Sequence, residues 1–319
     1  MNKLKLSIVI PVYNGAAYIK TALETLTAQM MEGVELVVID DGSVDGTAQV
    51  ITDSFAEQIR SGAINLLVQP NRGVSAARNL GIDSARGDYI GFFDGDDAAL
   101  PGYIQKILAA AAGGVDIIEF GYKTFVASID ETLHGTAQYT NKSFGLHQPK
   151  AVLDGIHAIA RWYPWTRVFK SVLFDGIRFP SGVRMCEDVM TIPLLYEKAG
   201  SVLNLSDALY GYRINQAGAT FNVKPDYVPN LESFYQTIPR SGMRRHDYLR
   251  FTIAFAIASC QLKSQGAVGL PKAMIADMHK LRFVASVYRE LELRKVIVVL
   301  YPTLFTLIRR FTKPARSNA

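Results

Sequence analysis

Three carboxylates directly follow an apolar run in the segment Tyr89–Asp97, which reads Tyr-Ile-Gly-Phe-Phe-Asp-Gly-Asp-Asp. Like charges a few ångströms apart repel strongly in a partly dry site, so Asp94, Asp96 and Asp97 fit together best where a divalent cation or solvent neutralises them. Ligand sets made only of oxygen are typical of magnesium or manganese. The alternative is a solvated turn, since aspartate and glycine are common turn residues.

The elements around this cluster alternate between strands and helices. Apolar, β-branched runs that begin at residues 6, 34, 64, 89 and 115 predict strands, and the segments 17–30, 47–60, 74–85 and 101–112 predict helices. Nearly continuous hydrophobic strands joined by helices are typical of an α/β fold with a mostly parallel sheet, covered on both faces. Ligands bind such sheets beyond the carboxyl ends of the strands, so the polar residues there are the candidate site.

Two further strand ends carry polar residues. Asp41 and Gly42 form a turn that either caps the next helix or places a carboxylate beside the imide N–H of uracil or a ribose hydroxyl. Small residues from Gly73 to Ala77 let the next helix approach an anionic group, or let it pack tightly on the sheet. No GxGxxG follows the first strand, so a Rossmann dinucleotide site is disfavoured.

Four segments, each at a predicted strand end, together resemble the motifs of the family 2 glycosyltransferases. They are Ser-Ile-Val-Ile-Pro-Val-Tyr-Asn at 7–14, Asp-Asp-Gly-Ser at 40–43, the stretch 71–79, and Asp-Gly-Asp at 94–96. The resemblance covers about residues 5–215. It implies a GT-A type, Rossmann-like sheet and an inverting enzyme that uses a nucleotide sugar, usually a UDP-sugar.

The resemblance also implies which residues hold the donor. Asp96 and Asp94 would bind a divalent metal, Mn²⁺ or Mg²⁺, that bridges the diphosphate, with Asp94 also on the ribose side and Asp97 in support. The nucleotide-binding residues that it implies are Pro11, Val12, Tyr13, Asn14, Asp41, Asn71, Gly73, Ser75, Asp94, Gly95 and Asp96.

The pair Glu187-Asp188 is the candidate general base. Inversion in one displacement requires a carboxylate within hydrogen-bond reach of the acceptor hydroxyl, opposite the departing nucleotide. In similar enzymes the corresponding acidic pair supplies it, which makes Asp188 the first choice and Glu187 the second. The alternative is a pair that stabilises the start of the following helix.

Weaker signals suggest contacts to the acceptor or the diphosphate. Trp165 forms either an apolar wall for an acceptor sugar or part of the core, and Arg213, with Tyr212, forms either a diphosphate contact or a structural ion pair. Thr166 stands where family members often have asparagine, so the acceptor stays open.

Composition indicates a globular protein with a sizeable core. The chain has 319 residues, of which 49% are hydrophobic, and a net charge of +5, which is too mild to predict nucleic-acid binding. Cys186 and Cys260 are far apart and fit neither a disulfide framework nor a zinc site. We expect a cytoplasmic enzyme at the inner face of the cell membrane, because the N-terminus runs straight into a strand without a signal sequence.

The predicted organisation is a catalytic domain over 1–222 and a helical C-terminal region over 223–319. Within the former, 1–100 is the nucleotide-binding half and 101–222 the acceptor half, with 122–153 as an extended excursion from the sheet. The uncharged run Val296–Ile308 is too short to span a membrane and is flanked by basic residues. It predicts peripheral contact with an anionic membrane, with a packing helix or an oligomer contact as alternatives, and the oligomeric state stays open.

The leading hypothesis is therefore transfer of a hexose or N-acetylhexosamine to a hydroxyl of a glycan or lipid-linked acceptor. The resemblance implies a role in bacterial cell-surface polysaccharide or glycolipid synthesis. Two alternatives are a catalytically silent nucleotide-binding or scaffold subunit and a sugar nucleotidyltransferase. The intact Asp94, Asp96 and Asp188 argue against the first, and the lack of a basic glycine-rich loop after the first strand argues against the second.

Overall fold

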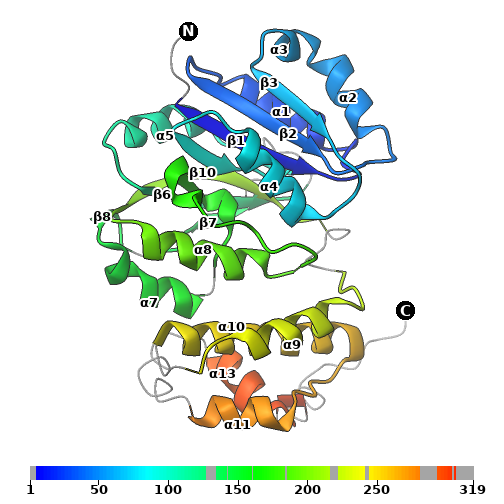
Figure 1. The fold of residues 1–319 in the computed structure, drawn as a ribbon, viewed down its shortest axis with the longest axis vertical. Coiled ribbons are helices and arrows are strands. Elements are labelled where there is room, and N and C mark those ends of the chain that lie inside the picture. The colour runs from blue at the N-terminus through cyan, green and yellow to red at the C-terminus, as the bar shows by residue number, and fades with distance from the viewer. Residues whose placement is uncertain are drawn as a thin grey trace. The chain divides into compact units, whose positions relative to one another are not determined.

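The structure is a computed structural model of the chain that describes residues 5–126, 134–141, 143–159, 161–183, 185–215, 222–240, 244–280, 293–303 and 305–306. It divides into two compact units (Figure 1). The first contains residues 1–153 and 161–215, and the second contains 154–160 and 216–319.

The first unit is built on a mixed sheet in which ten strands are described, with the path β3-β2-β1-β4-β9-β6-β10-β5 and with β7 on β6 and β8 on β10. The strands β1, β2, β3 and β4 are mutually parallel, whereas β9 runs antiparallel between β4 and β6. Their bounds are β1 Leu6–Val12, β2 Val34–Asp40, β3 Ile64–Val68, β4 Tyr89–Phe92, β5 Ala98–Ala99, β6 Ile117–Phe125, β7 His134–Gln138, β8 Gly145–His147, β9 Arg167–Lys170 and β10 Val202–Arg213. The predicted α/β fold is confirmed, with a mixed sheet whose strands β1, β2, β3 and β4 form the parallel part.

Helices cover both faces of this sheet, as predicted. Because side chains alternate along a strand, Ile8 and Ile10 of β1 face one layer, and they share a core cluster with α1 and α5. Val9 faces the other layer, where Gly81 of α4 lies against it. The helices of the first unit are α1 Ile19–Thr27, α2 Thr47–Ser54, α3 Ala56–Arg60, α4 Val74–Ser84, α5 Tyr103–Ala111 and α8 Glu187–Lys198, with short 3-10 turns η1 Pro164–Thr166 and η2 Ser171–Phe174. The helix α7 Pro149–Ile159 belongs to the first unit up to Leu153 and to the second unit from Asp154.

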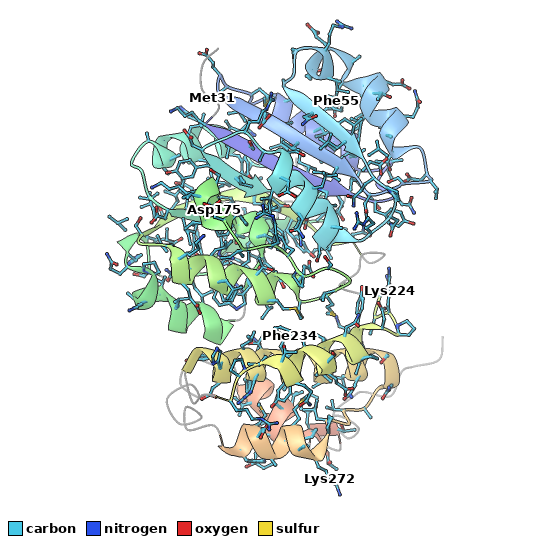
Figure 2. The ribbon with its side chains drawn as sticks, in the orientation of Figure 1. Met31, Phe55, Asp175, Lys224, Phe234 and Lys272 are labelled. Carbon is cyan, nitrogen blue, oxygen red and sulfur yellow. The ribbon has the colours of Figure 1, made fainter. Side chains whose placement is uncertain are left out.

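The sequence-based expectation was wrong for 122–153, which is not an excursion from the sheet. β6 continues to Phe125, β7 pairs with it, and β8 pairs with β10. These added strands are short and polar, so their stability comes from pairing with the sheet and not from a pattern visible in the sequence. The predicted helix 47–60 is likewise divided into α2 and α3 at Phe55, whose ring is buried (Figure 2).

The second unit is helical in its described part, with α9 Tyr227–Thr237, α10 Arg244–Gln265, α11 Lys272–Lys280 and α13 Leu293–Leu300. Four apolar residues of α13 are buried, and this helix contacts α10 and α11. Those residues are Val296, Val298, Val299 and Leu300. The predicted interfacial run extends to Ile308. After Leu300 the structure describes only 301–303 and 305–306 of this run. Within the described part of the chain, no helix is long and apolar enough to cross a membrane.

Candidate active site at the carboxyl edge of the sheet

The sheet topology gathers the predicted site residues at one edge. Parallel strands share a carboxyl edge, so the segments after β1, β2, β3 and β4 meet there, together with the ends of β6 and β10. The antiparallel β9 begins at the same edge, since Val168 pairs with Gly91 at the end of β4. The loop 161–166 before β9 therefore joins the carboxylates that follow β4.

Two loops on the nucleotide side are tied together by side-chain hydrogen bonds. The backbone N–H of Asn14 donates to Ser43 Oγ at 2.8 Å, and Asn14 Oδ1 accepts from the N–H of Val44 at 2.9 Å. Asn14 adopts a left-handed conformation with φ of 50°, which asparagine tolerates better than most residues. Pro11 and Val12 are buried in β1, whereas the Tyr13 ring is exposed and free to stack on a planar ligand.

Asp41 organises the third loop. Its Oδ1 accepts from Gln69 Nε2 at 2.6 Å and from the N–H of Arg72 at 2.9 Å, and its Oδ2 accepts from the N–H of Gly73 at 2.8 Å. Gly42 is required beside it, because its φ is +74° and a Cβ there would lie 2.7 Å from the backbone nitrogen of Asn71.

Two other residues of the predicted nucleotide set lie near this loop. Asn71 is exposed, whereas Ser75 is buried and its Oγ donates to the carbonyl of Val183 at 3.3 Å. The buried Ser75 hydroxyl thus connects the nucleotide side to the segment that leads into α8.

Residues of β10 hold the turn Asp94–Asp97 in place. Tyr210 OH accepts from the N–H of Asp94 at 3.1 Å and donates to Asp97 Oδ2 at 2.5 Å. The N–H of Arg213 donates to Asp97 Oδ1 at 2.7 Å, and Arg213 Nε donates to the carbonyl of Asp96 at 2.6 Å. Asp97 is therefore a buried residue that fixes the turn. Arg213 binds the turn through its backbone N–H and its Nε.

Asp94 and Asp96 are the half-buried carboxylates of this turn. Burial raises the pKa of Asp94 to about 6, against the opposing effect of Arg78, and Asp96 adds to the rise. Gly95 between them packs against Val12, where a Cβ would meet side-chain carbons at 3.2 Å. The repulsion expected from the sequence is therefore present in the folded site.

We tested whether these residues fit a divalent metal. Among the described residues, no group of three or more His, Cys, Asp or Glu side chains is arranged to hold a metal ion. Magnesium is usually held by one or two carboxylates together with substrate phosphates and water, and manganese also prefers oxygen ligands. Asp94 and Asp96 fit such a site in ligand type and number.

A buried arginine joins the two acidic groups of the edge. Arg78 Nη1 donates to Glu187 Oε1 at 2.7 Å, Arg78 Nη2 lies 3.5 Å from Asp94 Oδ1, and the guanidinium lies 5.3 Å from the centre of the Phe179 ring. The role of Arg78 as a bridge between α4, α8 and the Asp94 turn has no local signal, because the three segments are far apart in sequence.

Glu187 and Asp188 begin α8, after Cys186 in a left-handed conformation. Glu187 is paired with Arg78, whereas Asp188 Oδ1 accepts the N–H of Val189 at 2.7 Å. Burial raises the pKa of Asp188 to about 7, and the adjacent Glu187 charge adds to the rise. A carboxylate with this pKa suits a general base near neutral pH.

Trp165 belongs to a stack of aromatic rings. Its ring plane lies within 4° of that of Tyr163, 19° of Tyr210 and 11° of Tyr212, with centroid separations of 4.8, 4.5 and 5.2 Å. It is only 5% exposed. Of the two alternatives predicted for Trp165, the structure therefore favours the core position.

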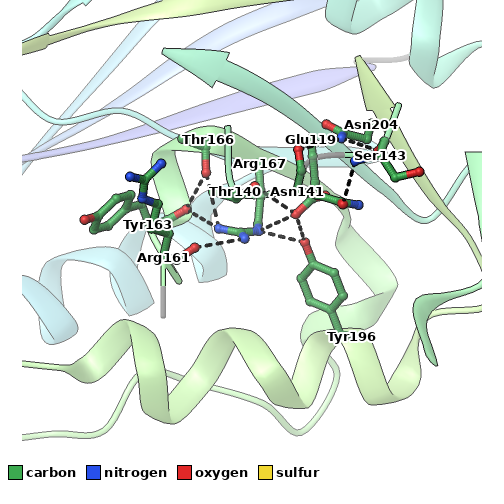
Figure 3. Close-up of polar contacts among 10 residues, drawn as sticks. All are labelled: Glu119, Thr140, Asn141, Ser143, Arg161, Tyr163, Thr166, Arg167, Tyr196 and Asn204. Atoms are coloured by element: carbon green, nitrogen blue, oxygen red, sulfur yellow. Dashed lines mark hydrogen bonds and ion pairs between the residues drawn. The ribbon is translucent and has the colours of Figure 1, made fainter. Parts of the chain in front are cut away.

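A second polar network anchors the start of β9 (Figure 3). Arg167 and Glu119 form a fully buried ion pair with 3.1 Å between Arg167 Nε and Glu119 Oε1, and the Tyr196 hydroxyl donates to the same Glu119 oxygen. Arg167 Nη1 donates to the carbonyl of Tyr163 at 2.8 Å, and Nη2 to the carbonyl of Arg161 at 3.0 Å. The guanidinium thus fixes the backbone of the loop 161–166.

Comparison with known proteins shows which class this fold and site belong to. The model of the family described as glycosyl transferase family 2 matches residues 7–162. An uncharacterized glycosyltransferase, EpsJ of Bacillus subtilis (strain 168), is 30% identical over 237 residues, which are 72% of this chain and 67% of that protein. The minor teichoic acid biosynthesis protein GgaA of the same strain is 27% identical over 79% of this chain and 58% of its own length.

Solved structures share the fold. The S. aureus TarS fragment 1–349 in complex with UDP-GlcNAc superposes with a TM-score of 0.66 at 19% identity, over 96% of this chain and 89% of that one. A mannosyltransferase from Pyrobaculum calidifontis in complex with GDP-Man and Mn²⁺ superposes with a TM-score of 0.55 at 15% identity, over 98% of this chain and 88% of that one. The fold is that of GT-A glycosyltransferases. The chain belongs to glycosyl transferase family 2 and is a glycosyltransferase.

Proposed function

We propose that this glycosyltransferase is an inverting, metal-dependent enzyme that moves a hexose or N-acetylhexosamine from a UDP-sugar to a hydroxyl of a glycan or lipid-linked acceptor. The observation that carries the proposal is the Arg78 bridge, which joins the Asp94 turn and the start of α8 at one edge of the sheet. A donor site and a general base are needed within one substrate length of each other, and this bridge supports that arrangement.

The nucleotide is proposed to lie over the loops after β1, β2 and β3. The exposed ring of Tyr13 would stack on the base, and the loop that Asp41 orders would surround it, with Gly73 leaving room for a close approach. UDP is proposed as the carrier because the family resemblance implies it, and the TarS neighbour binds UDP-GlcNAc.

The diphosphate is proposed to reach the turn that carries Asp94 and Asp96. These two residues would hold Mn²⁺ or Mg²⁺, and the bound ion would neutralise the charge that builds on the leaving diphosphate. The Pyrobaculum calidifontis neighbour, which was solved with Mn²⁺, supports this part of the proposal. Tyr210 and Asp97 keep the turn in place for that purpose.

Asp188 is proposed to take the proton of the acceptor hydroxyl. As the bond from that oxygen to the anomeric carbon forms, the bond from the anomeric carbon to the diphosphate oxygen breaks, and the configuration inverts. Glu187 is the second choice, because its Oε1 is already bound by Arg78 Nη1. The half-buried position of Asp188 keeps its pKa near the working pH.

The proposed setting is the synthesis of a bacterial surface polysaccharide or glycolipid, which the name of the relative GgaA supports. We retain 1–222 as the proposed catalytic domain. Contact of the region 223–319 with an anionic membrane is proposed to use its basic residues, because four apolar side chains of α13 (Val296, Val298, Val299 and Leu300) are already buried.

The proposal is tested by incubating the full chain with UDP-glucose, UDP-galactose and their N-acetylated forms, with and without MnCl₂, and measuring UDP release. We expect turnover of at least one donor, loss of metal-dependent turnover in Asp96→Ala, and loss of transfer in Asp188→Asn. Donor binding without turnover would favour a silent nucleotide-binding subunit. Unchanged transfer in both variants would disprove the assignment of the site.

A further inference from the structure

Tyr163 is the ring at the loop end of the aromatic stack. Trp165 is 5% exposed and Tyr210 is fully buried, so neither has a ring face available to a ligand. Tyr163 stacks on Trp165 in almost parallel planes and is itself only half-buried. Two half-buried rings stack on Trp165, Tyr163 before β9 and Tyr212 in β10. We assign the acceptor contact considered for Trp165 to Tyr163, because this ring lies on the loop before β9 and the charge of Asp188 acts on it.

The backbone beneath this ring is fixed. The carbonyl of Tyr163 accepts from Arg167 Nη1 at 2.8 Å and from Thr166 Oγ1 at 3.0 Å. The neighbouring Arg161 carbonyl accepts from Arg167 Nη2. In Figure 3 the ring of Tyr163 points away from this network. A ring held by rigid supports loses little entropy when it binds a ligand, which favours a preformed contact surface.

The loop that carries Tyr163 lies at the same edge of the sheet as the Asp94 turn, which Arg78 links to the start of α8. η1 contacts β4 and β6, which places the loop 161–166 near the turn that follows β4. Burial raises the pKa of Tyr163 to about 12, and the charge of Asp188 is among the neighbours that add to the rise.

We propose that Tyr163 is the platform on which the acceptor's terminal sugar stacks, and that the enzyme therefore selects a pyranose acceptor over an open-chain polyol. This inference rests on the proposed function and specifies its acceptor class. One face of a pyranose ring presents C–H groups and can be removed from water against an aromatic ring, while its hydroxyls stay at the edge. An open-chain polyol has no rigid apolar face and loses more freedom on binding.

The test compares acceptors and variants in the full chain with the UDP-sugar that gives the highest turnover. The pyranose acceptors are methyl glucoside, methyl galactoside and methyl N-acetylglucosaminide, and the open-chain acceptors are glucitol and ribitol. Each reaction is run beside one without acceptor, which measures transfer to water. We expect wild type to prefer at least one pyranoside by tenfold or more.

Two substitutions isolate the ring. Tyr163→Leu and Tyr163→Ala are expected to lower transfer to the pyranoside at least tenfold, mainly through KM, with transfer to water unchanged within twofold. Tyr163→Phe keeps the ring and is expected to retain most activity. Tyr301→Ala, which removes an exposed ring in the second unit, is the control and should change neither reaction.

The outcomes separate the two levels of the proposal. If no UDP-sugar is turned over, the proposed function is wrong and the platform falls with it. If transfer to water is intact but Tyr163→Leu transfers to the pyranoside as well as wild type does, the platform alone is wrong. A wild-type preference for glucitol or ribitol would overturn the acceptor class.

Discussion

Glu187 and Asp188 are adjacent carboxylates with different chemistry. Arg78 forms an ion pair with Glu187, whereas Asp188 Oδ1 accepts the backbone N–H of Val189 and the side chain is held partly out of water. The sequence supports the preference for Asp188 only by resemblance. The structure adds a physical reason, because a general base needs a carboxylate that is free to take a proton.

The raised pKa of Asp188 predicts the pH dependence of the reaction. Below about pH 7 the carboxyl is protonated and cannot accept a proton, so kcat/KM should rise as pH increases through about 7 and then level off. Asp188→Asn should lower activity by on the order of 10²–10⁴-fold and abolish this limb. Asp53→Asn, at an exposed position in α2, is the control and should leave the profile unchanged. A profile that falls across this range would contradict the assignment.

Loss of the Tyr210 hydroxyl should destabilise the protein more than loss of the equally buried Tyr103 hydroxyl. Tyr210→Phe removes the bonds to Asp94 and Asp97 and should cost about 1–3 kcal/mol of unfolding free energy, because Asp97 stays buried without that donor. It should also weaken donor binding with manganese. Within the described part of the chain, Tyr103 OH has no hydrogen-bond partner, so Tyr103→Phe should be neutral or stabilising. Thermal unfolding and titration of both variants with the donor in the presence of manganese check this prediction. Equal effects of Tyr210→Phe and Tyr103→Phe would contradict it.

At the scale of elements, the packing of α4 against β1 and β2 sets where the third loop lies. Gly81 of α4 is needed there, because a Cβ would lie 2.2 Å from Val9 Cγ1 and 2.9 Å from Ile39 Cδ1. α4 also carries Arg78 and begins after the loop that Asp41 orders. A shift of this helix therefore moves both sides of the site.

Gly81→Ala should destabilise the protein by about 1–3 kcal/mol through overpacking. The matched control is Gly155→Ala in α7, where a Cβ meets nothing within 4 Å. That change should stabilise by up to about 1 kcal/mol, since alanine favours a helix more than glycine does. Chemical denaturation of both variants measures the difference. If both substitutions changed the stability in the same direction, the contacts of Gly81 would not limit the packing of α4.

The elements that carry the site are predictable from sequence to different degrees. Strand starts at 6, 34, 64 and 89 follow from apolar composition, and the loops after them follow from the motifs. Arg78, Tyr163 and Tyr210 do not, because each acts through residues far away in the chain. The strands β7 and β8 were missed for the same reason, since their stability depends on strands that precede or follow them.

At the scale of the whole molecule, none of the described residues assigned to the site at the sheet edge comes from the helical second unit. Four apolar residues of α13, including Val298 and Val299, are buried. The predicted membrane contact must then rely on charge, which the basic C-terminal residues 309–316, outside the described part, could supply.

A membrane contact that relies on charge predicts binding to anionic vesicles, and salt should weaken this binding. The full chain should float with vesicles of phosphatidylcholine and phosphatidylglycerol at low salt, and a variant with Arg309→Glu and Arg310→Glu should float several-fold less. Arg60→Glu in α3 is the control with an exposed charge. Equal flotation of wild type and the double variant would contradict a role for these residues.

The position of Tyr210 has a thermodynamic consequence for the two substrates. Its ring stacks on Trp165, which supports the acceptor platform, and its hydroxyl holds the turn that is proposed to bind the metal and diphosphate. One side chain is thus shared by both halves of the reaction. If binding on either side alters the setting of Tyr210, donor and acceptor must change each other's affinity by the same factor. The donor Kd measured with and without acceptor would give the size of that linkage, and Tyr210→Phe should reduce it.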